Sequence, residues 1–153
     1  MDHLRLLSKG PEQTKDIADL IGQNIKGGEV IELVSDVGGG KTTFVKGLAR
    51  GMGSSETVRS PSFALAHEYK ASRLKLVHLD FYRLNEAGIM TLMLDESLQD
   101  PRSVVVVEWA GIIENVLPED RLRITIKVDT KDSRELLLAY PESMDYLMKD
   151  LEN

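Results

Sequence analysis

Residues Ser35 to Thr43 read S-D-V-G-G-G-K-T-T, and this stretch decides how the whole chain is interpreted. It fits the phosphate-binding loop pattern G-x-x-x-x-G-K-[ST] at every required position but the first, where Ser35 replaces glycine. Glycines allow backbone N–H groups to converge on an anion, Lys41 brings a positive charge, and the Thr42 hydroxyl is suited to ligate Mg²⁺. A serine fits the first position provided that its φ angle is negative.

The flanking sequence supplies the context that a phosphate-binding loop requires. Glu29 to Val34 is a short apolar run with β-branched residues, which predicts a buried strand. Apolar residues then recur at helical spacing from Phe44 to Met52, and Gly51 and Gly53 are expected to end that helix. The positive end of the helix would face the bound phosphates. The alternative, a glycine-rich loop that only joins a strand to a helix, is disfavoured by this order of elements.

Composition indicates an ordinary globular protein. The 153 residues predict a single domain spanning residues 1–153, with 42% hydrophobic and 29% charged residues. The chain has no cysteine, which excludes a disulfide scaffold and thiolate metal sites. We expect no membrane span and no signal peptide. The expected location is the cytoplasm. A net charge of −6 makes direct binding to nucleic acid phosphates unfavourable, so a role near nucleic acid should pass through a partner.

The other periodic segments predict alternating strands and helices. Helices are expected from Pro11, with Ile25 still on the apolar face, from Asn85 to Gln99, and from Pro141 to about Leu151. Strands are expected at residues 4–7, 63–67, 74–80, 103–108, 122–128 and 134–140, with turns at 70–73 and 129–133 that make two hairpins.

Four valines at 104–107 predict a central strand buried on both faces. We therefore expect an α/β fold like that of P-loop NTPases. Its mixed β-sheet would have a parallel core plus antiparallel strands, flanked by helices, and the nucleotide would lie at the carboxyl ends of the parallel strands.

Two carboxylates follow apolar strands, Asp80 after L-V-H-L and Glu108 after the valines. A carboxylate in such a place is usually a solvated strand end, but the phosphate loop favours a role near Mg²⁺ for both. Glu108 is the stronger candidate for the metal side because its strand is central, whereas Asp80 could hold the metal's water shell or orient the attacking water. We interpret His78 as a packed or hydrogen-bonded strand residue, and Trp109 as a core residue, a lid or a partner surface.

Four motifs follow one another along the chain, S-D-V-G-G-G-K-T-T-F at 35–44, S-P-S-F at 60–63, H-L-D-F-Y-R-L at 78–84 and V-E-W at 107–109. Together they resemble the TsaE family (formerly YjeE), small bacterial ATPases needed to make threonylcarbamoyladenosine in tRNA. The resemblance runs from about Thr14 to Arg134. It departs from the family pattern at Ser35, Gly39, Ser62 and Phe81, where glycine, alanine, threonine and leucine are usual.

The resemblance implies roles for the matching residues. ATP would be bound by Pro11, Thr14, Val37, Gly38, Gly39, Gly40, Lys41, Thr42, Thr43, Ser62 and Arg134. In that set, Ser62 would sense the γ-phosphate from a switch-like loop at 60–63, and Pro11, Thr14 and Arg134 would lie near the adenine and ribose. Mg²⁺ would be held by Thr42 and Glu108, and Lys41, Asp80 and Glu108 would act in catalysis. The implied partners are TsaD and TsaB, with tRNA met only indirectly through their complex.

Three other functions are compatible with a phosphate loop. A P-loop small-molecule kinase usually needs an arginine-bearing lid, and the arginines here are scattered. A GTPase needs an N-K-x-D or T-K-x-D element, and residues 130–133 read T-K-D-S. An ATP-binding scaffold without hydrolysis stays open, because turnover could require the partners.

Overall fold

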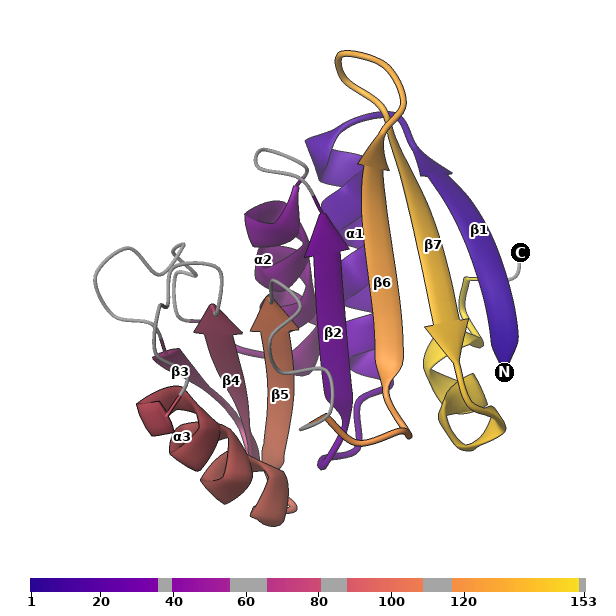
Figure 1. Cartoon of the computed structure of the whole chain (residues 1–153). Helices are drawn as coiled ribbons and strands as arrows, with labels where there is room; N and C mark the ends of the chain where they lie inside the picture. The colour runs from indigo at the N-terminus through magenta and orange to yellow at the C-terminus, as the bar shows by residue number, and fades with distance from the viewer. Residues whose placement is uncertain (36–39, 56–65, 81–87, 109–116, 152–153) are drawn as a thin grey trace.

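Seven described strands form one mixed sheet in a computed structural model that describes residues 1–35, 40–55, 66–80, 88–108 and 117–151. The strands are β1 (Asp2–Ser8), β2 (Val30–Ser35), β3 (Ala66–Ala71), β4 (Leu74–Asp80), β5 (Ser103–Glu108), β6 (Leu122–Val128) and β7 (Arg134–Tyr140). The described helices are α1 (Pro11–Gln23), α2 (Lys41–Met52), α3 (Gly88–Gln99) and the 3-10 helix η2 (Glu142–Met148). Their arrangement is shown in Figure 1.

The sheet has the order β1-β7-β6-β2-β5-β4-β3. Strands β4, β5, β2 and β6 run parallel, while β3, β7 and β1 are antiparallel to their neighbours β4, β6 and β7. This confirms the predicted α/β class, the parallel core and both hairpins. The turn between β3 and β4 comes later than predicted, because Lys70 and Ala71 still pair with β4 and the turn residue Ser72 has a φ of 61°. The first part of the strand predicted at 63–67 lies outside the described residues.

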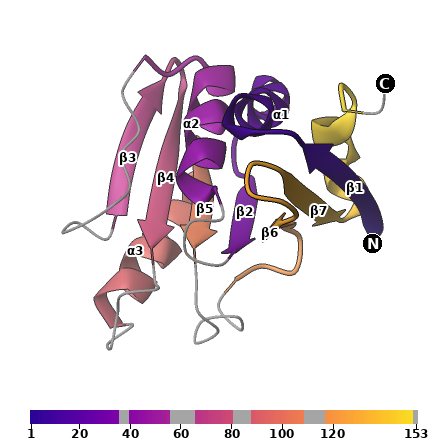
Figure 2. The ribbon, with the colours of Figure 1, turned by 90° about the horizontal axis from the view of Figure 1, so that it is seen from above.

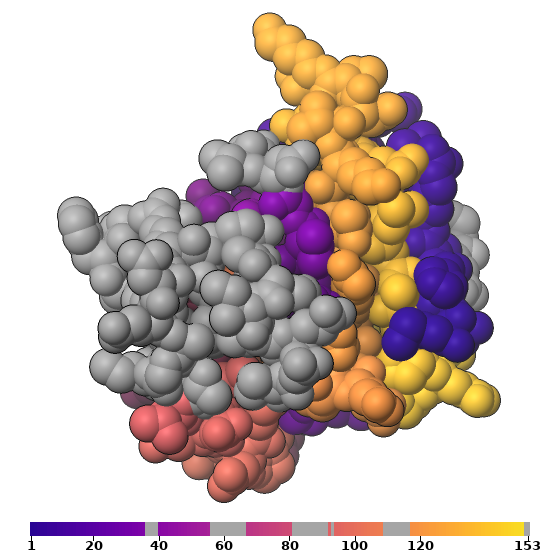
Figure 3. All heavy atoms as spheres, viewed as in Figure 1, coloured from indigo at the N-terminus to yellow at the C-terminus, as the bar shows by residue number. Residues whose placement is uncertain are grey.

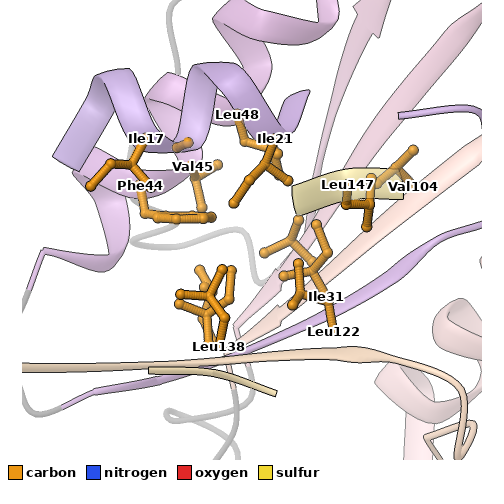
Figure 4. Packing of buried hydrophobic residues seen from close by; sticks show 14 of the residues in the cluster. Ile17, Ile21, Ile31, Phe44, Val45, Leu48, Val104, Leu122, Leu138 and Leu147 are labelled. Carbon is orange, nitrogen blue, oxygen red and sulfur yellow. The ribbon is translucent and has the colours of Figure 1, made fainter. Parts of the chain in front are cut away.

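Helices cover both faces of the sheet (Figures 1 and 2). On one face α1 and α2 pack on the central strands, and Figure 4 shows Ile17 and Phe44 from these helices facing Ile31 and Leu122 of the sheet. On the other face α3 contacts β4 and β5. All six residues of β5 are buried, as the run of valines predicts, because this strand has a helix on each side.

Three glycines allow α1 and α2 to pack with their backbones close together. A Cβ atom at Gly51 would overlap the carbonyl oxygen of Asp19, one at Gly47 would overlap that of Lys15, and one at Gly22 would overlap that of Leu48. The expectation that Gly51 ends α2 is therefore wrong. The helix continues through Gly51 to Met52 and ends at Gly53, whose φ of 93° suits a helix C-terminus. Gly51 is needed for packing between helices, a requirement that helix propensity does not reveal.

We expect Gly51→Ala to lower the free energy of unfolding by about 1–3 kcal/mol, because its methyl group would force α1 and α2 apart. Gly10→Ala is the matched control, since no atom lies within 4 Å of a Cβ built there and its φ of 178° is extended. Urea unfolding of the two variants measures the difference. Equal unfolding midpoints for Gly51→Ala and the wild type would contradict the packing argument.

Two helix boundaries also differ from the predictions. Helix α1 ends at Gln23, so Ile25 lies beyond it, although its side chain still packs against the core. The C-terminal helix is the 3-10 helix η2 and does not reach Leu151 as a helix. A three-residue repeat aligns Met144 with Leu147, and both are buried against the sheet.

A buried carboxylate fixes η2 to the start of β2. The Tyr146 hydroxyl donates to Glu29 Oε2 at 2.6 Å, and Lys26 Nζ lies 4.1 Å from the centre of the Tyr146 ring. Burial and this bond to the Glu29 carboxylate raise the pKa of Tyr146. None of the described helices has the length and the apolar character needed to cross a membrane.

Candidate functional site

Three strands end side by side at the edge of the sheet where α2 begins (Figure 1). Ser35 ends β2, Glu108 ends β5 and Asp80 ends β4. In the register, Glu108 pairs with Leu33 of β2 on one side and with Asp80 of β4 on the other. The two carboxylate residues that the sequence singled out are therefore direct neighbours, next to the strand that leads into the phosphate-binding motif.

The start of α2 has the properties of an anion site. Its N-cap, Gly40, has a φ of 108°, which only glycine adopts at low cost, and this residue has no side chain with which to cap the helix. The first turn contains no acidic residue, so the positive end of the helix is not neutralised from within that turn. Lys41, Thr42 and Thr43 occupy this turn and are half-buried. Val37, Gly38 and Gly39 lie outside the described residues.

Ser35 is accommodated at the first motif position, as expected. Among non-glycine residues in the described ranges, only Ser72 has a positive φ, so Ser35 has the negative φ that a side chain requires. Its carbonyl oxygen lies 3.5 Å from Lys41 Nζ, a long contact that holds the ammonium group near the end of β2.

The two carboxylates are buried on the α1 and α2 side of the sheet. Glu108 is 4% exposed, Asp80 is 5% exposed and His78 is fully buried. His78 Nε2 lies 3.1 Å from Glu108 Oε1, which confirms His78 as a packed, hydrogen-bonded strand residue. A solvated strand end, the ordinary interpretation of such carboxylates, does not describe either of them, because a buried carboxylate is costly unless it has partners.

A cavity of about 200 Å³ lies beside the start of α2. Five of its lining residues are among those that the sequence predicted to bind a cofactor, and they come from α1, from the start of α2 and from β7, namely Pro11, Thr14, Gly40, Thr43 and Arg134. The sixth, Asp132, was not predicted. It lies in the β6–β7 turn, where a single aspartate carries no recognisable signal, and only the folding of that hairpin brings it to the cavity.

The family model described as "Threonylcarbamoyl adenosine biosynthesis protein TsaE" matches residues 8–136, a range that contains every predicted site residue. The chain belongs to the TsaE family. A curated TsaE of Bacillus subtilis is 43% identical over 136 residues, which cover 89% of this chain and 85% of that protein. A TsaE of Treponema pallidum is 32% identical, with 89% of this chain and 100% of that protein covered.

A solved structure shares the fold. The crystal structure of Bacillus subtilis YdiB matches with a TM-score of 0.80 and 37% identity, over 98% of this chain and 94% of that one. The resemblance found in the sequence is thus confirmed, and TsaE membership gives the protein a role in the biosynthesis of threonylcarbamoyladenosine in tRNA.

In this TsaE chain, Arg134 organises the hairpin turn that forms one wall of the cavity. Its Nη1 donates to the carbonyl oxygens of Thr130, Lys131 and Ser133 at 3.3, 3.3 and 3.0 Å. A second link spans the turn, because the N–H of Asp129 donates to the carbonyl oxygen of Ser133 at 3.0 Å. Arg134 therefore both lines the cavity and shapes the loop that carries Asp132.

On the α1 side of the cavity, side-chain hydroxyls order the start of the helix. Ser8 Oγ donates to the carbonyl oxygen of Gly10 at 2.8 Å and lies 2.6 Å from Thr14 Oγ1. Pro11, at the first position of α1, needs no N–H partner there. These contacts join the end of β1 to the start of α1.

A larger cavity of about 370 Å³ lies on the opposite face of the sheet, between side chains of β1, β6 and β7 such as Arg5, Arg123 and Leu137. Figure 3 shows this face, where no described helix covers these three strands. The cavity contains no predicted site residue. Ser62 and Trp109, which the sequence also singled out, lie outside the described residues.

Proposed function

We propose that this TsaE-family protein binds ATP together with Mg²⁺ and hydrolyses it, and that this cycle supports TsaD and TsaB in threonylcarbamoyladenosine synthesis. The observation that carries the proposal is that two buried carboxylates, Asp80 and Glu108, lie at the same edge of the sheet as the start of α2, whose N-cap is a glycine. Phosphate-loop enzymes need a cationic cradle and a carboxylate at the same place.

Each part of the nucleotide has a suitable set of residues. Backbone N–H groups of residues 37–42 and the Lys41 ammonium would hold the phosphates, since N–H groups at a helix N-terminus and an ammonium group both attract anions. The cavity beside the start of α2 would take the ribose and adenine, with Pro11, Thr14, Thr43 and Arg134 as its walls. Ser62 would contact the γ-phosphate.

The oxygen atoms of Thr42 and Glu108 are suitable ligands for Mg²⁺. No three His, Cys, Asp or Glu side chains in the described ranges are grouped so that they could hold a metal ion. Mg²⁺ usually takes one or two protein oxygens and completes its shell with phosphate and water. Thr42 and Glu108 would supply those protein oxygens, and the ion, when bound, would neutralise charge on the phosphates. Asp80, beside Glu108, would orient water or hold the water shell of the metal.

The proposed partners are the TsaD–TsaB pair, with tRNA reached only through them. A net charge of −6 suits docking on a protein assembly better than direct contact with tRNA phosphates. The proposed location is the cytoplasm.

ADP formation from ATP and Mg²⁺, with and without TsaD–TsaB, tests the activity. Release of ADP without any acceptor molecule supports a hydrolase. Strict dependence on an added acceptor would instead assign a P-loop small-molecule kinase, and binding without turnover in the presence of both partners would leave an ATP-binding scaffold.

We expect the nucleotide to change the affinity for TsaD–TsaB by about 5- to 150-fold, which is a coupling of about 1–3 kcal/mol. The physical reason is that a loop ordered by the γ-phosphate loses its contacts on hydrolysis, so ATP and ADP favour different states. Pull-downs with an ATP analogue, with ADP and without nucleotide measure the ratio. Ser62→Ala should reduce it, whereas Ser143→Ala, at an exposed position of η2, should not. Equal capture in all three nucleotide conditions would refute the switch.

A further inference from the structure

His78 and Glu108 form a buried pair between β4 and β5. His78 is 0% exposed, and its Nε2 lies 3.1 Å from Glu108 Oε1. The register pairs Glu108 with Asp80, and His78 with Val106. The Glu108 side chain therefore contacts a residue of β4 that lies two positions before its register partner Asp80. His78 and Glu108 are diagonal neighbours on one face of the sheet, because side chains two residues apart along a strand point to the same side.

The chemistry of the pair defines which atoms are engaged. A carboxylate only accepts hydrogen bonds, so Nε2 of His78 is the donor. Nδ1 of His78 is buried and has no hydrogen-bond partner, so among the described residues the ring is hydrogen-bonded only to Glu108. Within the same ranges no hydrogen bond to Glu108 Oε2 is found.

The burial of Glu108 makes this bond important. Glu108 is 4% exposed and follows four buried valines, so little water is available to fix the orientation of its carboxylate. A hydrogen bond to a charged group is worth more than a neutral one, and a buried carboxylate without it would turn to find another partner. Carboxylates that ligate metals are commonly held by such a second hydrogen bond.

We propose that His78 is a positioning residue, which holds Oε1 of Glu108 so that Oε2 is directed to the Mg²⁺–nucleotide. The inference rests on the proposed function, in which Glu108 lies on the metal side. In this role His78 touches neither the nucleotide nor the metal, and its contribution is transmitted through the orientation of one carboxylate.

Two amide substitutions separate this role from simple packing. The amide nitrogen of glutamine in His78→Gln reaches about the position of Nε2, so it can still donate to Glu108. The shorter amide in His78→Asn reaches only the position of Nδ1 and loses the bond. We expect H78N to raise the Mg²⁺ concentration needed for half-maximal binding of a non-hydrolysable ATP analogue by about 10-fold. H78Q should stay close to the wild type, and binding of the analogue in EDTA should be equal in all three proteins.

The neighbouring histidine provides the control. His67 of β3 is paired with His78 in the register and its Nε2 has no partner among the described residues, so His67→Asn alters the same face of the sheet without touching Glu108. This variant should keep the wild-type Mg²⁺ dependence. If thermal melting shows that H78N does not fold, His78→Leu is used in its place, because leucine fills the site without a hydrogen-bond donor. The same rise in the required Mg²⁺ concentration is then expected of His78→Leu.

The outcomes are distinguishable. An unchanged Mg²⁺ dependence in H78N overturns the inference, and so does an equal loss in H78N and H78Q, which would indicate packing alone. If the wild type itself binds the analogue with no dependence on Mg²⁺, the proposed function fails instead. A selective loss in H78N, restored in H78Q, supports the positioning role.

Discussion

Replacing Lys41 with alanine is expected to lower the affinity for ATP–Mg²⁺ by about 10- to 150-fold while leaving the protein folded. The range corresponds to about 1.5–3 kcal/mol for a hydrogen bond to a charged group. Lys41 is half-buried at the first position of α2, and its ammonium contacts the end of β2 at the carbonyl oxygen of Ser35. The buried side chains of α2 are Phe44, Val45, Leu48 and Ala49, so the core does not depend on the lysine.

Lys46→Ala is the matched control, because Lys46 is an exposed lysine on the same helix. Isothermal titration with ATP–Mg²⁺ and thermal melting should be run on both variants and the wild type. The result that would remove the phosphate-loop assignment is an affinity of Lys41→Ala equal to that of Lys46→Ala.

The second large effect is expected at the two carboxylates. Asp80→Ala should slow hydrolysis by about 10²-fold and spare ATP binding, if Asp80 positions water, because this is the contribution of one acid–base group. Glu108→Ala should weaken Mg²⁺-dependent binding and hydrolysis together. Turnover is measured with TsaD–TsaB present, and binding is measured separately with a non-hydrolysable analogue.

Because Glu108 is hydrogen-bonded to His78, a more conservative substitution of Glu108 should be tested as well. Alanine there would leave the buried Nε2–H of His78 without an acceptor, which costs about 1–3 kcal/mol of stability. Glu108→Gln keeps an acceptor for His78 and removes only the charge, so it should melt close to the wild type and still lose the Mg²⁺ effect. Wild-type turnover in Asp80→Ala and Glu108→Gln would exclude both residues from the mechanism.

Several features of the fold were predictable because their causes are local. The glycine-rich loop, the apolar strand before it and the amphipathic helix after it are adjacent in the chain, and their order is confirmed for the described residues. The hairpin at 122–140 has alternating strands and a short polar turn. The unbroken valines of β5 reflect burial on both faces, so even the central place of Glu108 could be inferred.

Other features depend on contacts between distant segments. The sequence predicted that Gly51 ends a helix, whereas the structure shows that it is a packing residue. A side chain at Gly51 would overlap the backbone of Asp19 on another helix, and that contact is not visible in the sequence. Asp132 gave no signal, because its cavity exists only where the β6–β7 turn meets the starts of α1 and α2. The bond between His78 and Glu108 depends on strand register, which places β4 beside β5.

The sequence by itself determined the family of this protein and predicted phosphate-binding chemistry for it. The N–H groups of a phosphate-binding loop come from consecutive residues, so their pattern is visible in the sequence. Tertiary structure alone decided that Asp80 and Glu108 are neighbours, that both are buried, and that one of them is held by His78. Burial and partnership are properties of packing between strands and helices far apart in the chain, and no local pattern of residues specifies them.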